Sequence, residues 1–427
     1  MADDSEGEVS EETSQEEDQK LTGYHWKLLL FLSVATFFEG YDFLALTQIL
    51  PNLRADMNLP PEASGYLIGF INIGTVAAFW IVRRADVWGR KKVLTITIIG
   101  YTSFTFLSGL APDVYTFAIA QLLARIFLLG EWAISMVIAA EEFPSTKRGI
   151  AMGVIQACSS LGSIACAGTV PFLLTTDYGW RTVYFIGILP LVVLMIARRG
   201  MRETTRFTAI QNEAPVGWFD IWHTGYAKRV LILALIWFVA YIPASNGVAF
   251  WKEFAVAERG FTDAQVGAAI TFAAIGSMPF VFASGWLIDW LGRKRGGAII
   301  FVSGGAGIYA AYTLEGIVPL TIALGFGIFA ASAYLPVLNA YSTELFPTKL
   351  RGMAYAWCNN LLGRIGYVGS PAIVGVLVGE TGSFGSVVAP LALFNVVVVV
   401  LIYTLLPETG SRSLEDTAAV DQSPTSF

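Results

Sequence analysis

The segment "DVWGRKK" at residues 86–92 recurs as "DWLGRKR" at residues 289–295. A second segment, "EEFPSTKRGIAM" at 141–152, recurs as "ELFPTKLRGMAY" at 344–355. Both recurrences have the same offset of 203 residues, which is hard to obtain by chance for two separate motifs. The chain therefore consists of two homologous halves in tandem.

The composition indicates an integral membrane protein. Of 427 residues, 55% are hydrophobic and 14% are charged, whereas a soluble protein carries about 25% charged residues. A helix that crosses a bilayer needs about 20 mostly apolar residues. Twelve such stretches occur, near 27–50, 63–82, 93–111, 115–137, 150–172, 181–198, 229–251, 265–288, 297–314, 317–340, 352–378 and 385–406. We predict an all-α integral membrane fold, with twelve transmembrane helices in two pseudo-symmetric six-helix bundles.

The distribution of charge divides the chain further. The first 20 residues hold nine acids and one Lys and cannot form a core, which is typical of a disordered tail. Basic residues gather in the connections after the even-numbered spans, and the positive-inside rule places these connections and both termini in the cytoplasm. We expect a multi-pass protein of the plasma or inner membrane. Its predicted parts are an acidic cytosolic tail (1–22), an N-terminal bundle (23–200), a cytosolic linker (201–228), a C-terminal bundle (229–407) and a second cytosolic tail (408–427).

The repeated loop motif resembles that of the major facilitator superfamily, roughly Gly-x-x-x-Asp-Arg-x-Gly-Arg-Arg/Lys. The second copy, "GWLIDWLGRKR" at 285–295, matches well, while the first departs from the pattern at Val82 and Val87. The resemblance covers the whole chain. It implies two six-helix bundles that rock around a site near the middle of the membrane.

Shorter motifs resemble particular branches of that superfamily. "EGYD" at 39–42 is similar to the helix 1 signature of aromatic-acid:proton symporters, and "GEW" at 130–132 to helix 4 of metabolite:proton symporters. "LPETGSRSLED" at 406–416 resembles the C-terminal motif of sugar-porter-like and synaptic-vesicle-protein-2-like members, but the expected seventh helix lacks the Gln residues of sugar porters.

Two acids interrupt the first apolar span. A charge at the bilayer centre costs about 2.5–3.5 kcal/mol on insertion scales, so Glu39 and Asp42 need a reason to be there. They are three residues apart and can face one cavity. Carboxylates that share an apolar site hold protons more tightly than exposed ones, the property that proton coupling needs. We predict that both couple transport to protons; the alternative is a structural ion pair with Arg125.

Two arginines lie equally deep, Arg125 in the fourth span and Arg364 in the eleventh. An Arg fork facing a cavity can bind a carboxylate with two hydrogen bonds. The alternatives are an acid partner for Arg125 and a backbone carbonyl of the C-terminal half for Arg364. Glu131 is either a further proton site or part of the loop network. Other predicted substrate contacts are Tyr41, Tyr241, Asn246, Tyr334 and Asn360, each of which can also be a packing residue.

The resemblance also implies a cytoplasmic gate built from the repeated loops. In it, Asp86 and Asp289 cap a helix or pair with Arg148 and Arg351, while Glu141 and Glu344 join Arg90 and Arg293. The predicted gate residues are Asp86, Gly89, Arg90, Glu141, Arg148, Asp289, Gly292, Arg293, Glu344 and Arg351. The alternative is a purely structural role.

Together these patterns predict a proton-coupled symporter of a small organic anion, such as an aromatic carboxylate. An organic cation, a sugar or another neutral metabolite remains an alternative substrate, and a non-transporting sensor with the same fold an alternative function. The sequence has no phosphate-binding loop, catalytic triad or metal-ligand cluster, so we expect no enzymatic activity, no metal and no cofactor besides the coupling protons. The expected partners are the substrate and the lipid bilayer, without nucleic acid, for a monomer.

Overall fold

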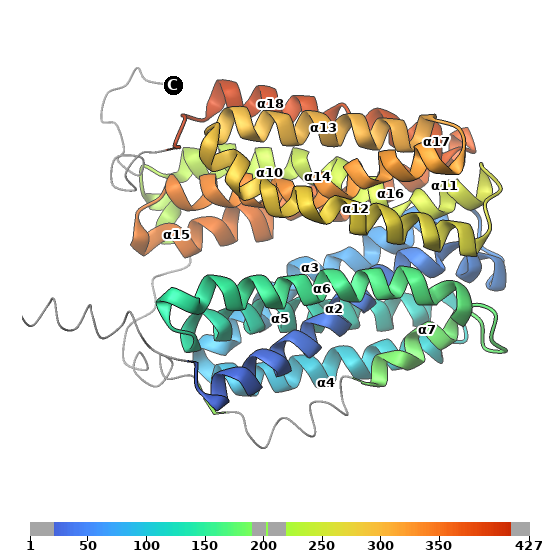
Figure 1. Ribbon diagram of the computed structural model, residues 1–427, viewed down its shortest axis with the longest axis horizontal. Coiled ribbons are helices and arrows are strands. Elements are labelled where there is room, and N and C mark those ends of the chain that lie inside the picture. Colours follow the sequence, from blue (N-terminus) through green and yellow to red (C-terminus); the bar gives the residue numbers. More distant parts are fainter. Residues whose placement is uncertain (1–20, 190–201, 204–218, 411–427) are drawn as a thin grey trace, which may run out of the picture.

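The computed structural model describes residues 21–189, 202–203 and 219–410, and no β-strand occurs in these ranges. Figure 1 shows two helical bundles side by side, one from the N-terminal half of the chain (blue to green) and one from the C-terminal half (yellow to red). The predicted all-α, membrane-spanning fold class is therefore confirmed.

The N-terminal bundle begins with a long helix that carries both acids of the first span. Its elements are α2 (Gly23–Asp56), α3 (Ala63–Trp88), α4 (Arg90–Gly109), α5 (Val114–Glu142), α6 (Ser145–Leu173), α7 (Arg181–Phe185) and the 3₁₀ turn η1 (Ile186–Ile188).

The C-terminal bundle repeats this order, with three of its spans divided into consecutive helical segments. Its elements are η3 (Asp220–His223), α10 (Ala227–Ala249), α11 (Trp251–Ala257), α12 (Asp263–Trp290), α13 (Arg293–Thr313), α14 (Ile317–Glu344), α15 (Thr348–Tyr355), the π-helical η4 (Ala356–Gly363), α16 (Arg364–Thr381), α17 (Phe384–Leu391) and α18 (Phe394–Leu405).

The observed helices agree with the predicted spans. Within the described residues, ten helical stretches are long and apolar enough to cross a membrane. The third predicted span is the shorter and more polar helix α4. The sixth span, 181–198, is described only as far as residue 189, and most of the predicted tails and linker lies outside the described residues.

The two halves repeat a specific connection between helices. Gly89 joins α3 to α4, and Gly292 joins α12 to α13. Their φ angles of 92° and 84° are disfavoured for residues that have a Cβ atom. The backbone N–H groups of Arg90 and Lys91 donate to Glu203, and those of Arg293 and Lys294 donate to Glu408. The "RET" and "PET" motifs thus supply the acid that caps the next helix of their own bundle.

Glu408, the acid that caps α13, lies outside the membrane-spanning helices, and the pKa of its carboxyl is shifted. Burial alone would raise the pKa of this carboxyl, but the backbone N–H groups that bind it outweigh burial and hold the pKa below its ordinary value. The charged form is therefore retained as the cap of α13 at neutral pH.

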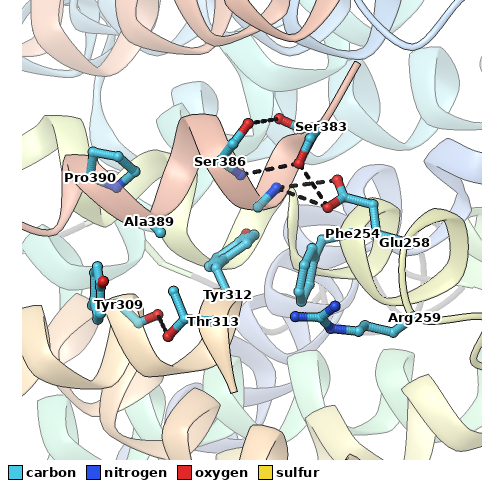
Figure 2. Close-up of a pocket in the computed structure, with 11 residues that line it drawn as sticks. Phe254, Glu258, Arg259, Tyr309, Tyr312, Thr313, Ser383, Ser386, Ala389 and Pro390 are labelled. Atoms are coloured by element: carbon cyan, nitrogen blue, oxygen red, sulfur yellow. Dashed lines mark hydrogen bonds between the residues drawn. The ribbon is translucent and has the colours of Figure 1, made fainter. Parts of the chain in front are cut away.

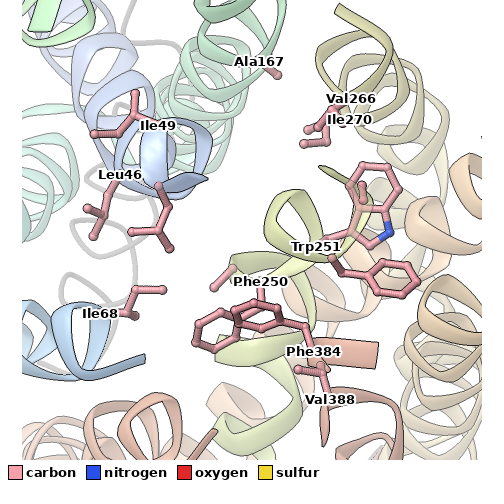
Figure 3. Close-up of a cluster of buried hydrophobic side chains, with 14 of the residues drawn as sticks. Leu46, Ile49, Ile68, Ala167, Phe250, Trp251, Val266, Ile270, Phe384 and Val388 are labelled. Atoms are coloured by element: carbon pink, nitrogen blue, oxygen red, sulfur yellow. The ribbon is translucent and has the colours of Figure 1, made fainter. Parts of the chain in front are cut away.

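Among the described residues, the buried hydrophobic cluster shared by the two bundles lies at one end of the molecule. We call the end that carries the 86–92 and 289–295 loops the motif end, and the other end the opposite end. One buried cluster at the opposite end combines Leu46, Ile49 and Ile68 of the N-terminal half with Phe250, Trp251 and Phe384 of the C-terminal half (Figure 3). The two remaining clusters each belong to a single bundle. The described packing therefore closes the opposite end.

Glycines make the close approaches that this arrangement needs. A Cβ at Gly40 of α2 would lie 1.8 Å from the carbonyl oxygen of Ser159 in α6. Between the bundles, a Cβ at Gly65 of α3 would lie 2.5 Å from Gly375 of α16. Small residues let helix backbones pack directly in a membrane, where the hydrophobic effect between helices is absent.

Candidate functional site

Both predicted acids of α2 are buried inside the N-terminal bundle. Glu39 is 5% exposed and accepts a 2.7 Å hydrogen bond from the Ser159 hydroxyl of α6. Asp42 is 6% exposed; its Oδ2 accepts a longer bond of 3.3 Å from Thr105 of α4, and its Oδ1 is buried without a partner. A buried carboxylate oxygen without a donor is costly, and protonation of Asp42 removes that cost.

Arg125 of α5 is buried close to these acids without pairing with them. It is 5% exposed, and its Nη1 has no hydrogen-bond partner among the described residues. Its guanidinium carbon lies 4.7 Å from the centre of the Phe43 ring. None of the ion pairs between described residues includes Arg125. The alternative ion pair with Glu39 or Asp42 is not formed, and the guanidinium interacts with them electrostatically at longer range.

Arg364 brings a second cation to the boundary between the bundles. It follows the π-helical η4, a form common at functional sites. Its Nη1 donates a 3.3 Å bond to the carbonyl of Thr75 in α3, and its Nε is buried without a partner. The alternative of a carbonyl partner in the C-terminal half was therefore wrong: the carbonyl belongs to the N-terminal half.

Tyrosines surround Arg364. Tyr241 of α10 donates a 2.7 Å bond to the Asn359 side chain, which in turn donates to the hydroxyl of Tyr355. The ring of Tyr367 lies 5.4 Å from that of Tyr241, at an angle of 71°. Both Arg125 and Arg364 interact electrostatically with Tyr367. Sequence reasoning missed Tyr355, Asn359 and Tyr367, although the aromatic and amide residues near Arg364 were a usable signal.

The other predicted contacts have different surroundings. Tyr334 packs edge-on against Tyr241, with ring centres 6.2 Å apart, and belongs to the same aromatic cluster. Tyr41 is buried with a hydroxyl that has no partner among the described residues. Asn246 donates to Ser370 and to its own helix, which indicates a packing role. Asn360 is half-buried next to Asn359, the amide that joins the tyrosines.

Glu131 of α5 is separate from both groups. It is fully buried and accepts a 2.7 Å bond from Ser135 of its own helix, while its Oε2 has no partner among the described residues. No hydrogen bond or ion pair between described residues joins Glu131 to the loop network. Its position therefore agrees better with a proton site than with the gate.

The predicted loop pairs form at the motif end. Arg90 donates to Glu141 at 3.0 Å, and Arg293 donates to Glu344 at 2.8 Å. Each pair lies within its own bundle, so it holds helices of one half together in this structure.

Of the two predicted Asp–Arg pairs, the described side chains test only that of Asp289 with Arg351. Asp289 pairs with Arg293, while Arg351 donates to the carbonyl of Thr343 at the end of α14, so the predicted Asp289–Arg351 pair is not formed. The Nε of Arg148 is buried without a partner in the described part of the chain. The side chain of Asp86 is not among those that the structure describes.

A polar latch that the sequence reasoning missed closes the opposite end. Glu253 of α11 is fully buried and accepts two bonds from Arg54 of α2, at 2.8 and 2.7 Å, and one from Ser64 of α3, at 2.7 Å. Its neighbour Lys252 is 2% exposed, pairs with Asp263 at 2.6 Å and donates to the carbonyl of Gln48 in α2. Both side chains of α11 therefore join the C-terminal bundle to the N-terminal one.

The available signal was the charged pair "KE" directly after the apolar run of the seventh span. The predicted span ended at residue 251, which placed this pair in a loop. The helix instead continues as α11 to Ala257.

The Glu253→Gln substitution is expected to open the opposite end. It leaves Arg54, whose side chain is 14% exposed, without its acid, and breaking a buried ion pair costs about 3–5 kcal/mol, or about 100-fold or more in the balance between states. Spin labels at the exposed positions Tyr178 and Glu315, in a variant without native cysteines, should then report an added population of longer distances. An unchanged distance distribution would contradict the latch.

Asp56→Asn is the matched control for that experiment. Asp56 pairs with Arg181 at 2.7 Å at the same end of the molecule, but within the N-terminal bundle, and both side chains are partly exposed to solvent, 45% for Asp56 and 29% for Arg181. Exposed pairs contribute about 0–1 kcal/mol, so the distances should stay as in the parent protein.

The described residues contain no group of three His, Cys, Asp or Glu side chains placed to hold a metal. What the site offers instead is two guanidinium groups, the buried one of Arg125 and the half-buried one of Arg364, beside tyrosine rings and buried carboxyls. Such a site can bind an anion with aromatic character and exchange protons next to it.

Comparisons with known proteins point in one direction. The sequence profile described as "Major Facilitator Superfamily" matches residues 32–253 and 233–426. A protein of Haemophilus influenzae described as a putative metabolite transport protein is 28% identical, over 93% of this chain and 99% of its own length. The cis,cis-muconate transport protein of Acinetobacter baylyi is 25% identical, over 87% of this chain and 92% of its own length.

Solved structures share the fold. The crystal structure of a nucleoside transporter superposes with a TM-score of 0.74, covering 88% of this chain and 100% of its own, at 14% sequence identity. At that identity the likeness establishes the fold, and the substrate has to come from the residues of the site.

Proposed function

This chain belongs to the major facilitator superfamily and is a transporter rather than an enzyme, and on that premise we propose that it carries a small organic anion in symport with protons. The favoured substrate is an aromatic or other unsaturated carboxylate. The observation that carries the proposal is the pair of guanidinium groups of Arg125, which is buried, and Arg364, which is half-buried; each has a buried nitrogen that lacks a hydrogen-bond partner in the described chain.

The substrate carboxylate would supply the missing acceptors. Arg125 comes from the N-terminal bundle and Arg364 from the C-terminal one, so a bound carboxylate touches both halves. Tyr241, Tyr334 and Tyr367 offer ring faces and edges for an unsaturated or aromatic body. The relative named for cis,cis-muconate supports this class of substrate.

Asp42 is the favoured proton carrier because its Oδ1 is buried without a donor. Glu39 and Glu131 each accept a hydrogen bond from a serine hydroxyl, and on this proposal they are further proton sites. A carboxyl that binds a proton weakens its attraction for Arg125 and leaves the guanidinium free for the substrate. Proton binding and substrate binding are then coupled through the charge of one residue.

The difference between the two ends of the molecule suits transport by alternating access. The positive-inside rule makes the motif end cytoplasmic, so both termini lie in the cytoplasm of a protein in the plasma or inner membrane. The latch at Glu253 then closes the outer side. The loop pairs Arg90–Glu141 and Arg293–Glu344 keep each bundle rigid while the bundles rock as a monomer.

Uptake into proteoliposomes tests this proposal. An inward proton gradient should drive accumulation of radiolabelled benzoate or cis,cis-muconate, and collapse of the gradient with a protonophore should end it. Substrates of matched size without the carboxylate, such as benzylamine and benzyl alcohol, are the controls.

Other outcomes identify other functions. Accumulation of benzylamine but not benzoate would replace the anion by a cation, for which the acids Glu39, Asp42 and Glu131 would be the contacts. Accumulation of a sugar would indicate a neutral substrate. Binding without accumulation of any solute would favour a sensor.

A further inference from the structure

A pocket lies at the opposite end of the C-terminal bundle, away from the transport site. It has a volume of about 370 Å³ and is formed by α11 with the loop after it, the end of α13 and the start of α17 (Figure 2). Its aromatic walls are Phe254, Tyr309 and Tyr312, and Arg259 supplies its cationic group. Nothing in the transport cycle described above uses this pocket.

Most N–H groups of the Arg259 guanidinium have no hydrogen-bond acceptor among the described residues. Among the described residues it donates one side-chain bond, to the carbonyl of Leu314 at 3.3 Å, and its Nε is buried without a partner. Its guanidinium carbon lies 4.9 Å from the centre of the Phe254 ring, which orients it beside the pocket (Figure 2). An anion in the pocket would meet a fixed positive charge.

Glu258, the acid of the pocket, already accepts hydrogen bonds from the start of α17. Glu258 accepts from the Ser383 hydroxyl at 2.9 Å and from the backbone N–H groups of Phe384 and Gly385, so it caps α17. No ion pair between described residues joins Glu258 to Arg259. The charge of Glu258 is therefore balanced by the start of α17, and that of Arg259 is left for a ligand.

Exposed positions, most of them apolar, continue along the helices beside the pocket. On α13 the exposed positions recur at helical spacing from the pocket downward: Thr313, Tyr309, Ala306 and Val302. On the adjacent α17 and α18 they are Ser386, Pro390, Leu393 and Val397. The polar groups lie at the helix ends and the apolar ones one to three turns deeper, the order of a lipid headgroup and its acyl chains.

We propose that this pocket binds the phosphate headgroup of a glycerophospholipid, with an acyl chain along the exposed apolar positions of α13 and α18. Tyr309, Ser386 and Pro390 line the pocket and are exposed, so a lipid can enter it from the side. A soluble anion of the same charge would use Arg259 but would not cover these apolar positions. The proposal is therefore independent of the identity of the transported substrate.

Lipid titration of the purified full-length protein tests it by native mass spectrometry. Palmitoyl-oleoyl-phosphatidylglycerol should bind with one site that Arg259→Gln weakens about tenfold, the effect of losing one charge-assisted hydrogen bond. Ser386→Phe, an exposed position where the added ring fills the pocket, should weaken it as well. Arg295→Gln removes an exposed arginine at the motif end and should leave the affinity unchanged.

Two reagents distinguish the sources of the phosphate. Diacylglycerol with the same chains and inorganic phosphate should each fail to compete with the labelled lipid. Equal binding of diacylglycerol, full competition by inorganic phosphate, or unchanged lipid affinity in Arg259→Gln would each overturn the proposal.

Discussion

Arg125→Met should weaken substrate binding roughly 100-fold while leaving the empty protein at least as stable as before. The guanidinium is desolvated and unpaired, so replacing it with an apolar side chain of similar length removes a buried charge, a change that is often neutral or stabilising. A bound carboxylate loses its partner, which costs about 3 kcal/mol or roughly 100-fold in affinity. Thermal unfolding with and without benzoate measures both effects.

The two readouts separate a lost ligand contact from a lost fold. The parent protein should unfold at a higher temperature when benzoate is present, and Arg125→Met should lose that shift with its own unfolding temperature unchanged or raised. Arg125→Lys keeps the charge without the fork and should fall between them. The carboxylate site is refuted if Arg125→Met retains the full benzoate shift. Arg295→Met, at an exposed position, is the control.

Asp42→Asn should uncouple transport from the proton gradient. The amide has the shape of a protonated carboxyl and can still accept the 3.3 Å bond from Thr105, so the packing of α2 against α4 is kept. It cannot release a proton. We expect at least about a 100-fold loss of gradient-driven uptake, because a carboxylic proton site is removed outright, while exchange of internal for external substrate continues.

Exchange and uptake measured on the same proteoliposomes provide the check. Retained exchange proves that the variant is folded and binds substrate. Uphill uptake at the parent rate in Asp42→Asn would exclude Asp42 as the proton carrier. Asp177→Asn makes the same chemical change at an exposed position between α6 and α7 and should behave as the parent. Ser159→Ala and Glu39→Gln then report on the neighbouring acid.

Much of the fold could be predicted because its determinants are local or repeated in the sequence. Apolar runs of about 20 residues predict spanning helices wherever the backbone must satisfy its own hydrogen bonds in lipid. The constant offset between the loop motifs predicted two like bundles, and the pairs Arg90–Glu141 and Arg293–Glu344 follow from it. Charged residues in the middle of apolar spans, such as Asp42 and Arg125, could be recognised as candidates because a charge inside the bilayer is costly.

The tertiary structure decided which of those charges meet. Arg125 stays apart from Glu39 and Asp42, Arg364 reaches across to Thr75, and Glu253 binds Arg54 at a separation of 199 residues. A sequence gives the depth of a side chain in its helix but not the rotation and tilt of one bundle against the other, since these depend on packing summed over both halves. The sequence by itself therefore determined a two-bundle membrane transporter with buried charges. Only the packed structure decided that Arg125 and Arg364 have no acid partner among the described residues and that the latch closes the opposite end.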